Sequence, residues 1–168
     1  MTGAAALLVF VTAERLLELW WAQRNTRALL ARGAVEHAPG HYPLIVALHA
    51  LWLLGLWVFG RSNPVSIGWL LVFFLLQAGR VWVLATLGTR WTTRILVLPG
   101  APLVASGPYR FVSHPNYIVV AGEIAVLPLC LGLTWYAVVF SLANAAVLAI
   151  RIRAESEALS RPVHDRRA

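Results

Sequence analysis

The sequence holds one cysteine, no lysine and few acidic residues. Cys130 cannot form an internal disulfide or a multi-cysteine metal site, and its position in an apolar run predicts a small packing role. His114 has no second histidine or cysteine at ligand spacing, and the other histidines are scattered, so no metal site is predicted. The sequence also has no serine–histidine–acid arrangement and no phosphate-cradling glycine loop. Without these arrangements, the sequence indicates residues that position a ligand and shows little sign of an activated nucleophile.

Long apolar runs dominate what is present. Hydrophobic residues make up 60% of the 168-residue chain and charged residues only 12%, which is too apolar for a soluble domain of this size. Each run is close to the roughly 20 residues that cross a bilayer as a helix. We therefore predict an all-α integral membrane protein with about five transmembrane helices. The runs lie at 4–21, 42–60, 65–87, 117–133 and 134–150, and the last two are expected to form a tight helical hairpin.

The basic residues are all arginines, and the net charge is +7. In a soluble protein this charge would suggest nucleic acid, but here the arginines lie between and after the apolar runs. They are concentrated in the connectors 22–41 and 88–116 and in the tail 151–168. By the positive-inside rule these segments are cytoplasmic and the N-terminus lies outside. We expect no nucleic-acid partner, and we expect the 88–116 loop and the tail to meet at the cytoplasmic face.

Glu14, Glu18, Arg80 and Glu123 interrupt the apolar runs, and each needs a partner or a water-filled cavity inside a membrane. Glu14 and Glu18, near the cytoplasmic end of the first span, are expected to reach the interface. Arg80 either extends its charged end to the interface or faces an internal cavity. Glu123 is expected to meet either an arginine or a bound polar ligand.

One face of the last helix is polar. At 100° per residue, Asn144, Arg151 and Glu155 fall within about 40° of one another. This face runs from the membrane interior into the tail, which favours a functional role over a surface ion pair.

The stretch "GPYRFVSHPNY", residues 107–117, concentrates polar and turn-forming residues before the fourth span. Pro115 is suited to the first turn of a helix, and the backbone N–H groups after it are free to bind an anion or a carbonyl. His114 could donate a hydrogen bond to a carboxylate. The rings of Tyr109 and Tyr117 could pack on a planar base or on a cationic sulfonium. This stretch is therefore a candidate binding loop.

Two segments together, "LVASGPYRFVSHPNY" at 103–117 and "RIRAESEAL" at 151–159, resemble the isoprenylcysteine carboxyl methyltransferase family. The resemblance covers roughly residues 86–160 within a single membrane domain, 1–168. It implies an integral membrane enzyme that transfers a methyl group from S-adenosylmethionine. The chain is most similar to small bacterial members that methylate long-chain alkylpyrones or alkylresorcinols. This similarity implies a bacterial plasma membrane location, a lipophilic acceptor, contact with membrane lipids and a polyketide synthase pathway.

The resemblance also implies roles for particular residues. Arg151 would face the acceptor, and Glu123 is the candidate general base for a phenolic acceptor. Two positions depart from the family pattern, because Ser113 stands where arginine is common and Ser156 stands where a second glutamate is common. The methyl-donor site would use Leu103, Val104, Tyr109, His114, Pro115, Asn116, Tyr117 and Glu155.

Two other functions remain open from the sequence. A membrane NADPH-dependent reductase of the sterol type also carries a His-Pro-Asn-Tyr motif near a glutamate, which "HPNYIVVAGE" partly fits. A non-catalytic membrane assembly protein would bind neither cofactor. The tail motif and the short chain favour the methyltransferase.

Overall fold

The computed structural model describes residues 2–160 and is almost entirely helical. Arg161, Arg166 and Arg167 of the predicted tail lie outside the described residues. The prediction of an all-α integral membrane fold is confirmed, because each of the five apolar runs forms one α-helix. These helices are α1 (Gly3–Ala31), α2 (Tyr42–Phe59), α3 (Ile67–Leu87), α4 (Pro115–Cys130) and α5 (Thr134–Ser160).

Length and composition distinguish three of these helices as able to cross a membrane. They are Tyr42–Phe59, Ile67–Arg90 and Thr134–Ala158, and α4 is a shorter apolar helix. α1 is longer than any of these but carries charged residues in its middle. Large apolar side chains such as Leu16, Leu71 and Leu75 are exposed on the outside of the bundle. A surface of this kind is suited to lipid rather than water.

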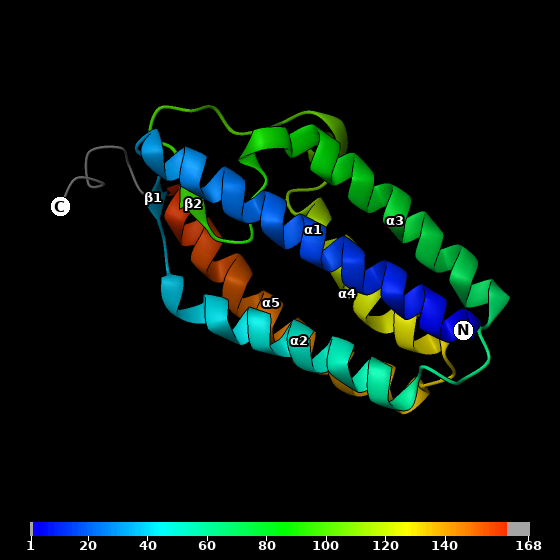
Figure 1. Ribbon diagram of the computed structural model, residues 1–168. Helices are drawn as coiled ribbons and strands as arrows, with labels where there is room; N and C mark the ends of the chain where they lie inside the picture. Colours follow the sequence, from blue (N-terminus) through cyan, green and yellow to red (C-terminus); the bar gives the residue numbers. More distant parts are fainter. Residues whose placement is uncertain (1, 161–168) are drawn as a thin grey trace.

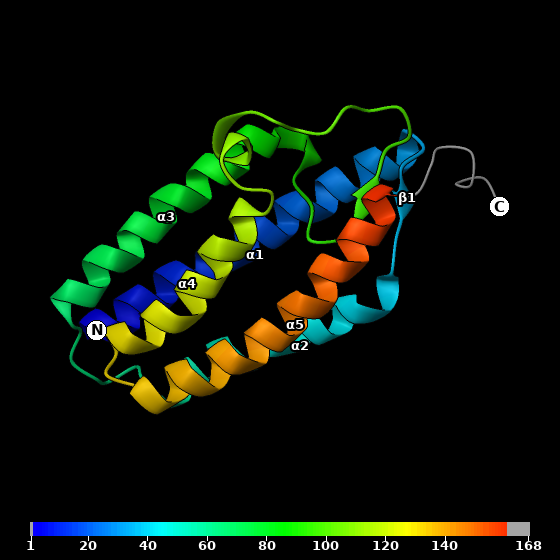
Figure 2. The ribbon, with the colours of Figure 1, turned by 180° about the vertical axis from the view of Figure 1, so that it is seen from behind.

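The helices pack around α4. α3 and α5 flank it, and α2 lies along α5. α1 lies beside α2, on the face of the bundle that is turned toward the viewer in Figure 1 and away from the viewer in Figure 2. The main apolar core occupies the half of the bundle near the α4–α5 turn, where Leu8, Leu56, Phe73 and Leu127 are fully buried. The other half contains the polar residues and the cavities described below.

The first helix is longer than predicted. The sequence placed its end at residue 21, but α1 continues to Ala31, so Arg24 and Arg27 lie on the helix and the connector prediction is wrong there. The Asn25 side chain is buried and donates hydrogen bonds to two backbone carbonyls of the 88–91 segment, at 3.1 and 2.9 Å. This anchor holds the extra turns against the protein, although their sequence is too polar for a membrane span. α1 ends where Gly33 takes a positive φ of 86°.

The α4–α5 hairpin agrees with the prediction. His114 is the N-cap residue of α4 and Pro115 is the first helical residue. α4 ends at Cys130, Gly132 takes a φ of 70°, and the Leu133 N–H donates to the Pro128 carbonyl at 2.9 Å. The turn is tight enough for α5 to begin at Thr134 and to pack back along α4.

A short antiparallel ladder, which the sequence did not reveal, closes the polar end of the bundle. β1 (Val35–Glu36) follows α1 and pairs with β2 (Leu96–Val97) in the loop after α3. Ile95 and Val97 pack on Ala158 of α5. The ladder therefore holds the loop that follows α3 against the C-terminal part of α5. Three 3₁₀ turns, η1 (Pro39–His41), η2 (Gly88–Arg90) and η3 (Gly107–Arg110), complete the connectors.

Candidate functional site

The motif loop folds into a compact turn over the end of α3. Gly107 takes a φ of 56° at the start of η3, and a Cβ there would collide with the Thr86 side chain. Glycine is therefore required at this point for two reasons, the left-handed backbone and the close approach to α3. The chain then crosses to α4, which begins at Pro115. This path places the side chains after Gly107 opposite the last turns of α5.

A cavity of about 770 Å³ lies between the motif loop, the β2 segment and the end of α5. Seven of the eight residues predicted to bind the cofactor line this cofactor cavity, together with Arg151. The exception is Pro115, which is buried and begins α4. The seven residues are Leu103, Val104, Tyr109, His114, Asn116, Tyr117 and Glu155.

Four polar side chains from the two sequence motifs meet at one wall of this cavity. The Tyr117 hydroxyl donates to the Glu155 carboxylate and accepts a hydrogen bond from Arg151 Nε at 2.8 Å. His114 stacks on the Tyr117 ring with 5.1 Å between centroids, and its Nδ1 lies 3.7 Å from Glu155 Oε2. Arg151 is fixed further by a hydrogen bond of 2.9 Å to the Thr93 carbonyl. Arg151 and Glu155, two residues of the predicted polar face of α5, thus form part of this wall.

Two further groups shape the cofactor cavity. Asn116 Oδ1 is buried and has no hydrogen-bond partner among the described residues, so this side chain offers an acceptor to a ligand. Tyr109 is half-buried, and burial together with the nearby Glu155 carboxylate raises the pKa of its phenol to about 12. The Tyr109 hydroxyl therefore stays protonated near neutral pH and remains a hydrogen-bond donor.

A second cavity, of about 320 Å³, adjoins the first and extends along the bundle. Its wall is mainly apolar and comes from all five helices and the segment after α3, with Leu16, Leu53 and Val120 among its residues. Arg15, Glu18 and Arg80 also line it. We call it the acceptor groove. Five residues line both cavities, namely Trp91, Thr92, Asn116, Tyr117 and Arg151. Arg151 therefore belongs to the wall of both cavities, of which the first contains more polar surface than the second.

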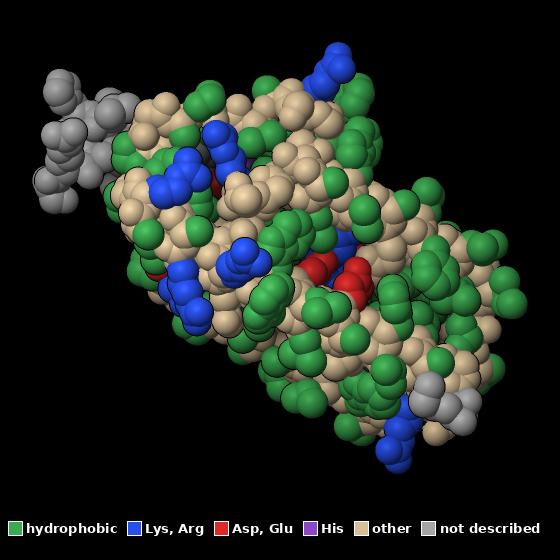
Figure 3. Space-filling model, turned by 45° about the horizontal axis from the view of Figure 1, so that its top comes forward, with side chains coloured by type: hydrophobic (Ala, Val, Ile, Leu, Met, Phe, Trp, Pro, Cys, Tyr) green, Lys and Arg blue, Asp and Glu red, His purple; other side chains and the backbone are tan. Residues whose placement is uncertain are grey.

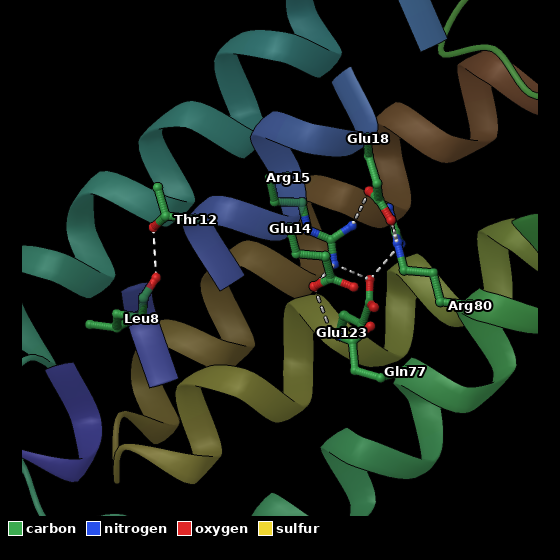
Figure 4. Close-up of polar contacts among 8 residues, drawn as sticks. All are labelled: Leu8, Thr12, Glu14, Arg15, Glu18, Gln77, Arg80 and Glu123. Carbon is green, nitrogen blue, oxygen red and sulfur yellow. Dashed lines mark hydrogen bonds and ion pairs between the residues drawn. The ribbon is translucent and has the colours of Figure 1, made fainter. Parts of the chain in front are cut away.

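A buried ion cluster lies deeper in the bundle, where α1, α3 and α4 meet (Figure 4). Arg80 is 5% exposed and donates to both Glu18 oxygens and, at 2.7 Å, to Glu123 Oε2. Arg15 bridges the same two carboxylates at 2.9 Å each. The expectation that Glu18 reaches the interface is therefore wrong, because a buried carboxylate between two guanidiniums is more stable than one in lipid.

The cluster settles the alternatives that the sequence left open for Arg80 and Glu123. Arg80 points inward, and Glu123 pairs with two arginines. Glu123 lines neither cavity, so its contacts are those of a structural ion pair, and its role as a general base stays a prediction.

The outer members of the cluster are partly accessible. Glu14 accepts a hydrogen bond of 3.0 Å from Gln77, and its side chain is 21% exposed. Figure 3 shows acidic and basic side chains at the floor of a hollow ringed by hydrophobic ones. Glu14 thus contacts α3, and its extension to the aqueous interface stays a prediction.

The chain matches the isoprenylcysteine carboxyl methyltransferase (ICMT) family over residues 69–161, more than half of its 168 residues. The chain belongs to this family. The matched region contains most of α3, the motif loop, α4 and α5, which supply most of the cofactor cavity. Family membership implies membrane methyltransferase activity, in agreement with the resemblance of the two motifs.

Two bacterial proteins are similar to the chain over most of its length. Uncharacterized protein YpbQ of Bacillus subtilis (strain 168) is 39% identical over 158 residues, which are 91% of this chain and 94% of the relative. An uncharacterized protein of Haemophilus influenzae is 26% identical over 157 residues, which are 89% of this chain and 91% of that protein. The similarity to both therefore extends beyond the ICMT region into α1 and α2.

Sequence reasoning missed the residues that complete the wall between the two cavities. Thr93 acts through its backbone carbonyl, which has no side-chain signature. Trp91 is 5% exposed and lines both cavities. The one available signal was the position of these residues in a polar loop that follows a span.

Proposed function

We propose that the protein transfers a methyl group from S-adenosylmethionine to an oxygen of a lipophilic acceptor at the cytoplasmic face of a bacterial plasma membrane. The observation that carries the proposal is the junction of the two cavities at Arg151 and Tyr117. A cavity lined by residues of both family motifs shares part of its wall with an apolar groove between the helices. This arrangement is suited to bringing a soluble donor and a lipid acceptor together.

The residues of the cofactor cavity fit S-adenosylmethionine. The cavity volume of about 770 Å³ lies within the roughly 300–1,000 Å³ typical of small-molecule sites. The Glu155 carboxylate offers a hydrogen-bond acceptor and a negative charge, and the buried, unpartnered Asn116 Oδ1 offers a second acceptor. Leu103 and Val104 provide an apolar wall for a planar base. When bound, S-adenosylmethionine supplies an electrophilic methyl group on a cationic sulfur.

Arg151 is the group best placed to act on the acceptor. Its Nε and one terminal nitrogen hold Tyr117 and the Thr93 carbonyl, which fixes the guanidinium at the mouth of the groove. A positive charge there stabilises an oxyanion and positions it for attack. Alignment of this kind contributes up to about 7–11 kcal/mol in favourable intramolecular reactions. The reaction then needs no metal ligand and no covalent enzyme intermediate.

The acceptor class follows from the proton balance and the shape of the groove. An acidic enol or a carboxylate arrives ionised near neutral pH, whereas a phenol must give up a proton. Glu123 is our proposal for that proton acceptor, but two guanidiniums already bind its carboxylate. We propose a long-chain polyketide ring as the acceptor, either an alkylresorcinol or the enol of an alkylpyrone, in preference to an isoprenylcysteine-type carboxylate. Each buried methylene adds about 0.8 kcal/mol, so affinity should rise with chain length.

The distribution of arginines supports the proposed orientation. Figure 3 shows basic side chains gathered at the end of the molecule where α1 and α5 end, while Arg61 follows α2 at the opposite end. Both the cofactor cavity and the ladder lie at the arginine-rich end. A reporter fused to the C-terminus should therefore remain cytoplasmic, and an exported reporter would refute the orientation.

The proposed function is tested with purified protein in detergent or nanodiscs. Calorimetry should detect S-adenosylmethionine binding and no NADPH binding; the reverse result would favour the sterol-type reductase. A labelled methyl donor is then offered with an alkylpyrone, an alkylresorcinol and a farnesylcysteine analogue. We expect label in the alkylpyrone. Turnover restricted to the farnesylcysteine analogue would refute the polyketide acceptor and leave the methyltransferase assignment intact.

A further inference from the structure

Two polar side chains in the acceptor groove take no part in the contacts described so far. Asn144 of α5 is 2% exposed, lines the groove, and makes no hydrogen bond within residues 2–160. A buried amide without a partner is costly. His49 of α2 lines the same groove. Neither residue belongs to the sequence motifs of the cofactor cavity.

The hydrogen bond of His49 fixes what its ring offers to a ligand. Its Nδ1 lies 2.9 Å from the Ile45 carbonyl oxygen. A carbonyl oxygen only accepts, so Nδ1 carries the hydrogen, and in the neutral ring Nε2 is left as an acceptor. No contact of Nε2 is found in the described part of the chain. The groove therefore contains an imidazole acceptor with a defined tautomer.

Helix geometry brings the two side chains to one level of the groove. α2 and α5 run side by side in opposite directions (Figure 1), and the Tyr136 hydroxyl of α5 donates to the carbonyls of Leu51 and Trp52 in α2. Asn144 lies eight residues beyond Tyr136, about 12 Å along α5, which places it beside the first two turns of α2. The His49 ring reaches back one turn to Ile45, into the same region.

This level is close to the reaction site. Asn144 precedes Arg151 by seven residues, about 10 Å along α5. Arg151, Asn144 and His49 all line the acceptor groove. A ring whose reacting oxygen is at Arg151 can therefore extend a second substituent along the groove toward Asn144 and His49.

We propose that His49 and Asn144 form a recognition site for a second hydroxyl on the acceptor ring, distinct from the oxygen that is methylated. A hydroxyl satisfies both residues, because it donates to Nε2 of His49 and accepts from the Asn144 amide. An apolar ring edge satisfies neither residue and leaves both groups buried and unpaired. This inference rests on the proposed function, since it takes the groove to be the acceptor site. It makes these two residues determinants of acceptor specificity.

The test compares two lipids that differ by one hydroxyl, 5-pentadecylresorcinol and 3-pentadecylphenol. Their dissociation constants are measured by calorimetry on the full-length protein in nanodiscs without methyl donor. The wild type should bind the resorcinol about tenfold more tightly, because its second hydroxyl pairs with His49 and Asn144, whereas the phenol leaves both groups unpaired. His49→Phe and Asn144→Leu should each reduce this ratio to about twofold or less and leave S-adenosylmethionine affinity unchanged.

Val147→Ala provides the matched control. Val147 lines the same groove one turn from Asn144, so its truncation should weaken both lipids alike and keep their ratio. Equal affinity of the wild type for the two lipids would overturn the proposal. His49→Phe and Asn144→Leu proteins that keep the wild-type ratio of the two dissociation constants would also overturn it. If Asn144→Leu lowers the melting temperature but keeps this ratio, Asn144 has a structural role.

The binding measurement separates this inference from the proposed function. A tenfold preference that disappears in both variants supports the recognition site even if no methyl transfer occurs. Conversely, methyl transfer to an alkylpyrone without any hydroxyl preference leaves the methyltransferase assignment standing and removes the role of His49 and Asn144.

Discussion

Replacement of Arg80 by leucine tests whether the ion cluster is a true interior network. The Arg80 side chain is 6% exposed and donates three hydrogen bonds, two to Glu18 and one to Glu123. Leucine would leave Arg15 as the only guanidinium for both carboxylates. Removing one member of a buried ion network typically costs about 3–5 kcal/mol. For a chain of this size, 1 kcal/mol shifts Tm by about 2–4 °C, so we expect Arg80→Leu to lower Tm by about 6–20 °C.

The assay is thermal unfolding of the purified protein in one detergent, followed by circular dichroism. The matched control is Arg94→Leu, because Arg94 also pairs with a glutamate, Glu36, but its side chain is 41% exposed. An exposed pair contributes about 0–1 kcal/mol, so the control should move Tm by no more than about 4 °C. Equal shifts in the two variants would refute the interior network. Adding Glu18→Gln to Arg80→Leu should recover part of the loss, since it removes one unpaired charge.

Three further changes probe the cofactor cavity. Glu155→Gln keeps the size of the side chain but removes its charge, so calorimetry should find S-adenosylmethionine affinity reduced about ten- to a hundredfold; unchanged affinity would return Glu155 to a surface role. Arg151→Lys loses the fork that holds Tyr117 and Thr93, so steady-state assays should find a larger fall in kcat than in cofactor affinity. Tyr109 has a folded pKa of about 12, above the ordinary value near 10, so the unfolded chain loses this proton first and stability should fall between about pH 10 and 12. Tyr109→Phe should lessen that fall in alkaline unfolding curves, and an identical pH dependence would contradict the burial of the phenol.

The helices were predictable because lipid leaves few alternatives. Apolar runs of membrane length must satisfy their backbone groups internally, so the positions of all five helices followed from hydropathy. The end of α1 did not follow, because its last turns are stabilised by Asn25 at a distant loop and not by hydropathy. The β1–β2 ladder was invisible for a similar reason. Two-residue strands carry no periodic pattern, and their pairing depends on how the loop after α3 folds back.

The part of the site formed by side chains of the two motifs could be predicted from the sequence. The order of the motifs and the resemblance brought Tyr109, His114 and Glu155 to one cavity, and the structure places them there. The contacts that pair elements far apart in the sequence were not predictable. Glu18 and Glu123 are separated by more than a hundred residues, and only the packing of α1 against α3 and α4 shows that they share Arg80.

The common wall of the two cavities has a thermodynamic consequence. Arg151 and Tyr117 line both compartments and are hydrogen-bonded to each other, so neither ligand can shift this pair without altering the surface that meets the other. A ligand that shifts this pair from one compartment therefore changes affinity in the other, and linkage requires the same factor in both directions. Under the proposed function, the level of methyl donor would set how firmly the protein holds its lipid acceptor.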